Sequence, residues 1–236
     1  MIDPLRDLAS VREATDRLLT AAAALDNATT TGPSRLPGWS RGHVLAHLAR
    51  NADALVNVLE GRPMYVSGEA RDADIERDAP RPLAAQLADV RDTAARFQAV
   101  GAGPADWNRT VELRNGVTDA AARIPFRRLI EVELHHVDLD IGYELEDLPG
   151  EFTAREIDFL AQRFTGRADV PPTRILATGQ DGAAGAVGGE WRTGGQDGIP
   201  VTVSGPVPAL LGWLAGRRDG KDLDTAGALL PTLPPL

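Results

Sequence analysis

A short segment past the middle of the chain carries most of the side chains that could bind a metal ion. Within residues 128–143, Glu131 and His135 are four positions apart, and Asp138 follows three positions later. If this segment is a helix, the four-residue spacing directs the carboxylate and the imidazole to one point on the same face. Such a pair could supply two of the three protein ligands of a catalytic zinc site.

Helical periodicity places these polar residues where a core is expected. Two apolar patches flank them: Ile130, Leu134, Val137 and Ile141 on one side, and Val132 and Leu139 on the other. The opposite face is expected to meet solvent and carries Glu133, His136 and Asp140. Because unpaired polar groups are costly to bury, two interpretations stay open. The segment is either a metal site in the core of a helical bundle, or a buried pair of Glu131 and His135 with Arg123 or Arg128. Asp138 would either hold a metal ligand by a hydrogen bond or pair with an arginine.

A second predicted helix offers the third ligand. Its apolar arc contains Val44, Leu48, Leu55 and Leu59. His47 lies at the edge of this arc and Asn51 lies within it, whereas His43 falls toward the polar side. His47 is therefore the better candidate. With the glutamate and histidine above, it would complete a set of two imidazoles and one carboxylate that leaves the fourth position of a zinc ion open.

Other motifs carry weaker signals. Arg217 and Arg218 follow the last predicted helix, where they are either a solvated helix end favoured by the helix dipole or a clamp for a substrate carboxylate. Ser40 has no partners for a catalytic triad and is expected to cap a helix. The chain contains no cysteine, which excludes disulfides and thiolate ligands from the protein. Any thiol chemistry would therefore need a thiol from a cosubstrate.

Composition narrows the partners and the location. The chain has 236 residues, of which 43% are hydrophobic, enough for a sizeable core. Its net charge of −9 argues against nucleic acid as a partner. There is no apolar run long enough to span a membrane, and the N-terminus lacks the pattern of a secretory signal. We therefore expect no membrane association and a cytoplasmic location.

The elements that must position these residues follow from the hydrophobic pattern. Amphipathic periodicity predicts four helices, at about 4–25, 40–59, 82–100 and 125–143. Two long connections join them: 62–80, a charged stretch interpreted as a solvated loop, and 101–124, with a short irregular pairing. Four amphipathic helices predict a helix bundle.

The pattern changes near Pro149. Predicted elements beyond it are a helix at 154–164, strands at 173–177, 189–193 and 199–204, a Gly/Ala-rich loop at 179–189, and a last helix from Pro206 to Leu214. The expected fold class is α+β, with an all-α domain over 1–149 and a small α+β domain over 150–236.

Three stretches of the chain resemble the mycothiol-dependent maleylpyruvate isomerase family. They are Leu36-Pro-Gly-Trp-Ser-Arg-Gly-His-Val-Leu-Ala-His-Leu-Ala-Arg-Asn-Ala-Asp-Ala-Leu55, Arg128-Leu-Ile-Glu-Val-Glu-Leu-His-His-Val-Asp-Leu139 with Gly142-Tyr143, and a C-terminal part from Val203-Ser-Gly-Pro206 through Leu210 to Arg217 and a closing Leu-Pro-Pro. The resemblance implies a DinB-like four-helix bundle followed by a small α/β domain similar to sterol-carrier folds.

The resemblance also implies a site and a reaction. A zinc ion would be held by His47, Glu131 and His135, and an arginine of the C-terminal domain would lie near the substrate. Arg217 matches that arginine best, with Arg218 as the alternative. Mycothiol would be the thiol cosubstrate, and zinc would lower the pKa of its thiol. The thiolate would add to the cis double bond of maleylpyruvate, the adduct would rotate, and elimination would give fumarylpyruvate, a step of gentisate-type aromatic degradation.

Two alternatives remain at this point. Related bundles resemble mycothiol S-transferases that act on other electrophiles. A zinc-stabilised binding protein without turnover belongs to a different class. Coordination separates them, because a fourth protein ligand such as Asp138 or Asn51 would close the site and favour a structural role. In either case we expect a monomer whose small-molecule ligand carries carboxylates.

Overall fold

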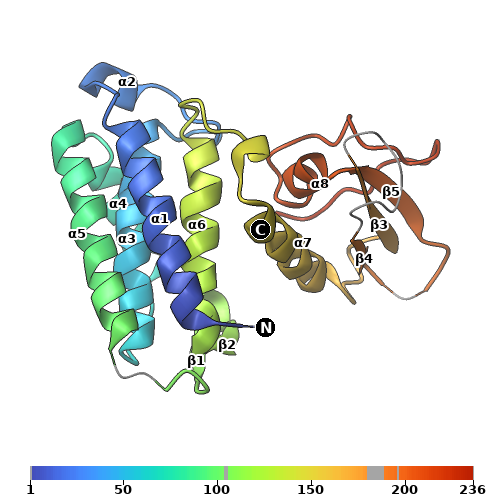
Figure 1. Ribbon diagram of the computed structural model, residues 1–236, viewed down its shortest axis with the longest axis horizontal. Helices are drawn as coiled ribbons and strands as arrows, with labels where there is room; N and C mark the ends of the chain where they lie inside the picture. The colour runs from blue at the N-terminus through green and yellow to red at the C-terminus, as the bar shows by residue number, and fades with distance from the viewer. Residues whose placement is uncertain (1, 104–105, 180–188, 196, 236) are drawn as a thin grey trace. The chain divides into compact units, whose positions relative to one another are not determined.

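The chain folds into two compact units, Met1–Tyr143 and Glu144–Leu236. The computed structural model describes residues 2–103, 106–179, 189–195 and 197–235. The helices of the first unit are α1 (Pro4–Ala22), α2 (Asn27–Thr31), α3 (Arg41–Leu59), α4 (Gly68–Asp78), α5 (Leu83–Ala102) and α6 (Ile124–Asp138). Four of them, α1, α3, α5 and α6, lie side by side as a bundle (Figure 1). The predicted helix bundle is thereby confirmed.

An apolar core fixes the spacing of the bundle helices. Leu18 of α1, Leu45 of α3, Phe97 of α5 and Ile124 of α6 are each at most 1% exposed. Burying one such side chain stabilises the fold by roughly 1.5–3 kcal/mol. Because α3 packs against both α5 and α6, this core keeps α3 and α6 next to each other, which a site shared between them requires.

The start of α3 is set by its N-cap. The Ser40 hydroxyl accepts the backbone N–H of His43 at 3.3 Å, and the His43 ring nitrogen Nδ1 accepts the backbone N–H of Ser40 at 3.2 Å. Two of the free N–H groups at the helix end are thus satisfied. The predicted capping role of Ser40 is confirmed.

Replacing Ser40 by alanine is expected to lower the free energy of unfolding by about 1 kcal/mol, since one backbone N–H of α3 loses its acceptor. Urea unfolding followed by circular dichroism measures this change. Ser40→Thr, which keeps a hydroxyl at the cap, is the matched control and should unfold close to the natural chain. Equal stability of the alanine and natural proteins would contradict the capping role.

The interpretation of residues 62–80 as a loop is wrong, because α4 occupies Gly68–Asp78. Ser67 caps this helix by accepting the N–H of Ala70 at 3.0 Å. Only Ile75 and Asp78 of α4 are buried, so the helix has no apolar stripe for periodicity to detect. It is held against α3 instead, partly through an ion pair of Asp78 with Arg50.

Helix α6 is shorter, and more fully covered, than its pattern predicts. It ends at Asp138 rather than near Tyr143, since Asp140 and Gly142 have positive φ of 55° and 91°, which a right-handed helix does not allow. Its predicted solvent face is also wrong at two of three positions. Glu133 is 2% and His136 3% exposed.

The reason for this burial is packing by neighbouring segments. Arg17 of α1 pairs with Glu133 at 2.5 Å, and Tyr143 donates its hydroxyl to the same carboxylate at 2.9 Å. The Tyr143 ring stacks on His136 with centroids 4.0 Å apart. Polar side chains with such partners tolerate burial, and single-helix periodicity cannot anticipate partners from elsewhere in the chain.

The connection between α5 and α6 contains the expected short pairing. Strand β1 (Thr110–Glu112) pairs antiparallel with β2 (Thr118–Ala120), with Val111 opposite Asp119. The short helical turn η1 (Arg114–Gly116) closes this hairpin. A second turn, η2 (Ala121–Arg123), leads directly into α6.

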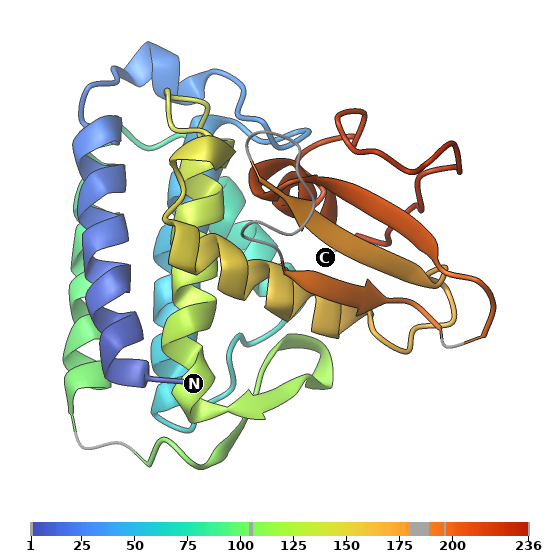
Figure 2. The ribbon, with the colours of Figure 1, turned by 45° about the vertical axis from the view of Figure 1, so that its right-hand side comes forward.

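The second unit is a small sheet with two helices, as predicted for the C-terminal part. Its elements are η3 (Leu145–Asp147), α7 (Gly150–Phe164), β3 (Thr173–Thr178), β4 (Glu190–Thr193), β5 (Val201–Pro206) and α8 (Val207–Leu214). Strand β3 is central, antiparallel to β4 and parallel to β5 (Figure 2). The predicted loop at 179–189 lies almost wholly outside the described residues.

The helices of this unit bury the sheet. Helix α7 packs against β4, and α8 packs against β3 and β5. The resulting core contains Phe164, Ile175, Val203 and Leu210, each fully buried. Alternate residues of β3 face this core, as expected for a strand covered on one side.

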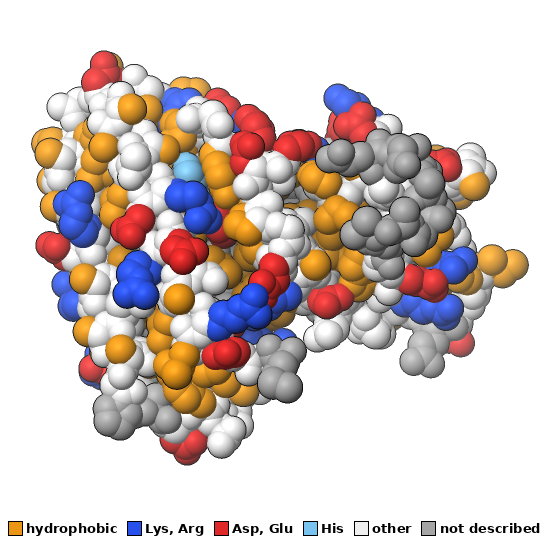
Figure 3. Space-filling model, viewed as in Figure 1, with side chains coloured by type: hydrophobic (Ala, Val, Ile, Leu, Met, Phe, Trp, Pro, Cys, Tyr) orange, Lys and Arg blue, Asp and Glu red, His pale blue; other side chains and the backbone are white. Residues whose placement is uncertain are grey.

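The surface carries charges of both signs. On the face shown in Figure 3, acidic and basic side chains are interspersed rather than gathered into a basic stripe. No helix in the described part of the chain has the length and apolar character that crossing a bilayer requires.

Candidate metal centre

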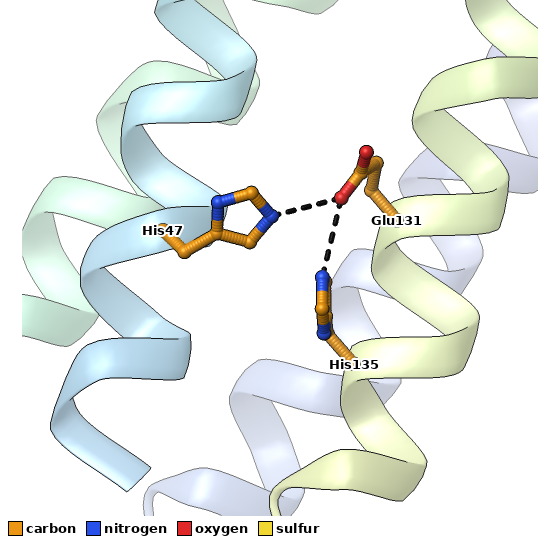
Figure 4. Close-up of side chains that lie close together, drawn as sticks. All are labelled: His47, Glu131 and His135. Carbon is orange, nitrogen blue, oxygen red and sulfur yellow. Dashed lines mark hydrogen bonds and ion pairs between the residues drawn. The ribbon is translucent and has the colours of Figure 1, made fainter. Parts of the chain in front are cut away.

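Helices α3 and α6 direct three potential ligands toward one another. His47 extends from α3, and Glu131 and His135 extend from α6 (Figure 4). The Glu131 carboxylate oxygen Oε2 lies 2.9 Å from His47 Nε2 and 3.2 Å from His135 Nε2. The three ligand atoms all lie within 4.8 Å of one another. Among the described residues, this is the one group of three such side chains close enough to share a metal ion.

The surroundings combine burial with an opening at the carboxylate. His47 is 6% and His135 9% exposed, and their rings meet edge to face with centroids 4.7 Å apart. The Trp39 ring lies 5.5 Å from the His47 ring. The side chain of Glu131 is 32% exposed. A ligand arriving from solvent could therefore reach the cluster on the side of the glutamate.

The protonation states suit metal binding in part. Burial lowers the pKa of His47 to about 4, although Glu131 opposes this shift, so the ring is neutral near pH 7. Burial acts in the same direction on His135, but hydrogen bonds to Asp138 and Glu131 outweigh it and raise the pKa. For Glu131, burial is outweighed by the two histidines, which hold its pKa well below 4.5. The cluster thus contains one neutral imidazole and one ionised carboxylate.

Asp138 supports His135 from behind. It is fully buried, and its Oδ2 lies 2.8 Å from Nδ1 of His135. This leaves Nε2 of the ring directed at Glu131. A carboxylate behind a ligating histidine fixes the ring and its tautomer. The first of the two roles open for Asp138, a hydrogen bond to a candidate ligand, is present.

Replacing Asp138 by asparagine is expected to weaken zinc binding by about 10- to 100-fold, because the ring of His135 loses its charged acceptor. Competition with a chromogenic chelator measures the affinity. Asp140→Asn is a suitable control, since Asp140 is half exposed and pairs with Arg35 and Arg41 instead. Unchanged zinc affinity in Asp138→Asn would show that this hydrogen bond does not support the site.

Other candidates from the sequence lie outside the cluster. His43 caps α3 and faces Glu76 at 3.4 Å. Asn51 accepts a hydrogen bond from Arg128 at 2.8 Å, which engages the oxygen that could have closed the site. Arg128 is fully buried and also donates to the Leu48 carbonyl at 2.9 Å. Its hydrogen bonds therefore link α6 to α3 near the candidate ligands. Arg123 pairs with Asp119 instead.

Sequence reasoning missed Arg71 and Tyr65, which both lie in the stretch interpreted as a loop. Arg71 Nη2 is 3.1 Å from Nδ1 of His47, and the charges of Arg71 and Glu131 both act on the Tyr65 hydroxyl, whose pKa is raised by burial. The one available signal was Ser67 as a helix cap, which would have put Arg71 and Ile75 on the same face of a helix.

Arg217 and Arg218 belong to the second unit, in the turn after α8. The guanidinium of Arg218 forms two bonds of 2.8 Å with the carboxylate of Glu146. Arg217 donates to the Ala215 carbonyl at 2.7 Å. Both line a cavity of about 590 Å³ between the end of α8 and the C-terminal residues 230–235.

The donor set of the cluster suits a divalent transition metal such as zinc. Two imidazole nitrogens and one carboxylate oxygen are ligands that zinc prefers, and three protein ligands leave a position for a water, a thiol or a substrate. Since Asp138 and Asn51 are directed elsewhere, neither is placed as a fourth ligand. The arrangement fits a catalytic site better than a closed structural one.

Fold and cluster together define a class: helical bundles with a three-donor metal site between two helices, followed by a small sheet unit. Comparison with protein families narrows this class. Residues 11–140 match the family model of the mycothiol maleylpyruvate isomerase N-terminal domain. The match covers more than half of the chain, and the chain belongs to this family.

Solved structures agree with this assignment at the level of the fold. The crystal structure of the mycothiol-dependent maleylpyruvate isomerase superposes with a TM-score of 0.82 at 24% identity, over 99% of this chain and 97% of that chain. A variant of that enzyme in which one histidine is replaced by alanine gives the same values. The expected order, a helical domain followed by a small sheet domain, is thereby confirmed. The search of curated proteins gives no significant match.

Proposed function

We propose that this chain is a zinc- and mycothiol-dependent cis–trans isomerase that converts maleylpyruvate to fumarylpyruvate. The observation that carries this proposal is the cluster of His47, Glu131 and His135 inside a chain of this family. A three-ligand set without a fourth protein donor supports an open, catalytic centre. The similar fold belongs to an isomerase that depends on mycothiol, which supports both the thiol and the substrate.

The residues of the chain would hold the metal and keep it accessible. His47 and His135 would bind through Nε2, the ring nitrogens that face Glu131, and Asp138 would keep the proton on the far nitrogen of His135. When bound, zinc would lower the pKa of a thiol in its open position, so that a thiolate is present near neutral pH. The exposed side of Glu131 would admit the thiol, while Trp39 would shield His47 from water.

The reaction proposed here needs a nucleophile but no redox cofactor. The thiolate sulfur forms a bond to one carbon of the cis double bond, and the electron pair of that bond moves toward the conjugated carbonyl. The former double bond is now single and rotates. Return of the electron pair re-forms the double bond in the trans geometry and breaks the carbon–sulfur bond, so the thiol is recovered unchanged.

A carboxylate-bearing substrate also needs an anchor, and we assign this role to Arg217. A guanidinium binds a carboxylate by two parallel hydrogen bonds. Arg217 and Arg218 line the same cavity after α8, and the resemblance of the sequence to the family favours Arg217. In this proposal the bundle domain, 1–149, binds the metal, and the domain 150–236 contributes to substrate binding.

The direct test is isomerisation of maleylpyruvate by purified, metal-analysed protein with and without mycothiol. The proposal predicts turnover that requires both mycothiol and about one zinc per chain. A bound zinc without turnover would reject the isomerase and favour transfer of mycothiol to other electrophiles. Turnover without any thiol would contradict the proposed chemistry altogether.

A further inference from the structure

Arg71 of α4 is a cationic side chain that contacts His47, one of the three candidate metal ligands. Its Nη2 lies 3.1 Å from Nδ1 of His47, and its Nη1 lies 2.6 Å from the carboxylate of Asp72. A guanidinium can only donate hydrogen bonds, so Nδ1 must accept. The ring proton of His47 is then on Nε2, where it is donated to Glu131 at 2.9 Å.

This arrangement is incompatible with a metal ion on His47. The ion would take the lone pair of Nε2, the nitrogen that faces Glu131 (Figure 4). The proton of the neutral ring must then move to Nδ1. A proton on Nδ1 would point at the N–H of Arg71, so that two donors face each other without an acceptor. Occupation of the centre therefore requires Arg71 to leave its place against His47.

The released guanidinium would keep its contacts with the Asp72 carboxylate and the Tyr65 hydroxyl, and it could bind a further anion in place of His47. The side chain of Arg71 is 14% exposed, whereas that of Asp72 is 62% exposed. Because an ion pair with a solvated partner contributes little to stability, Asp72 holds the guanidinium only weakly. The charges of Arg71 and Glu131 both act on the Tyr65 hydroxyl. Tyr65 also lines a cavity of about 580 Å³, together with Ser67 and Arg114.

We infer that metal binding releases Arg71 from His47 and that its guanidinium then binds a carboxylate of the substrate beside the metal. This inference rests on the proposed function for the identity of the substrate, but not for the release itself. It assigns the first unit a carboxylate anchor of its own, in addition to Arg217.

The release of Arg71 can be tested by zinc affinity, without measuring enzyme activity. Arg71→Gln is expected to bind zinc about three- to tenfold more tightly than the natural chain, because no hydrogen bond to a charged group is lost on binding. Chelator competition measures this. Arg96→Gln is the matched control, since Arg96 is an exposed bundle arginine paired with Asp53 and should leave zinc affinity unchanged.

Carboxylate binding is tested with maleate, a stable cis-dicarboxylate, titrated calorimetrically into the zinc-loaded proteins. Arg71→Gln is expected to bind maleate at least tenfold more weakly than the natural chain, and Arg96→Gln equally well. Arg71→Lys keeps one positive charge but cannot form two parallel bonds, so it should also bind maleate more weakly. If the glutamine variant fails to fold by circular dichroism, the lysine variant carries the test.

Two results would overturn the inference. Weaker zinc binding in Arg71→Gln would show that Arg71 supports the centre instead of leaving it. Equal maleate binding in the natural chain and both Arg71 variants would show that Arg71 does not bind the carboxylate. If maleate binding depends on Arg71 while maleylpyruvate is not isomerised, the proposed function fails and this inference stands.

Discussion

The His47→Ala protein is expected to lose its zinc during purification and to show no thiol-dependent turnover. Removal of one of three ligands should weaken zinc binding by far more than the 10- to 100-fold loss that follows from losing a supporting hydrogen bond. His135→Ala should behave in the same way, since both imidazoles contact the same carboxylate oxygen. Metal analysis of the purified proteins and the mycothiol-dependent assay measure the two effects.

The chain contains a matched control for this experiment. His43 lies one helical turn before His47 on α3, but it caps the helix and faces Glu76. His43→Ala should therefore lower stability modestly and retain one zinc per chain. If His47→Ala kept full activity without metal, the zinc-dependent mechanism would be excluded.

Arg217→Ala is expected to lower kcat/KM for maleylpyruvate by about 100-fold while zinc stays bound. The magnitude corresponds to loss of one well-placed charged donor at a reacting substrate. Because Arg217 lies in the second unit and the ligands lie in the first, metal content should not change. Steady-state kinetics and metal analysis on the same preparation separate the two quantities.

Arg218→Ala is the comparison for Arg217→Ala. It breaks the bond to Glu146, an ion pair with considerable exposure, so the cost in stability should be small. Its kinetics are expected to resemble those of the natural chain. The opposite outcome, loss of activity in Arg218→Ala alone, would move the anchor by one residue.

The sequence was most informative about the ligands. Periodicity placed Glu131, His135 and Asp138 between apolar patches of one helix and His47 at the edge of another, and the structure brings the first two together with His47. This worked because both helices have apolar faces that must meet in a bundle. The angular position of a polar residue around one helix thus predicts whether its side chain faces the core of the bundle.

The same method was wrong where burial depends on partners from other segments. Glu133 and His136 were expected in solvent, yet Arg17 and Tyr143 cover them. The pattern of residues 62–80 predicts a loop, because α4 within it has only two buried residues and shows no apolar period. That error concealed Arg71. Contacts of this kind depend on tertiary packing, which the periodicity of one helix does not encode, and for α4 the Ser67 cap was the one local signal.

X-ray absorption at the zinc edge, measured on zinc-loaded protein with and without mycothiol, shows whether the thiol binds the metal. Without the thiol, we expect zinc to have two imidazoles and further oxygen or nitrogen ligands. With the thiol, we expect one new sulfur neighbour of zinc at about 2.3 Å. A zinc shell that mycothiol leaves unchanged, with no sulfur, would contradict the account, because the thiol would then not be activated at this centre.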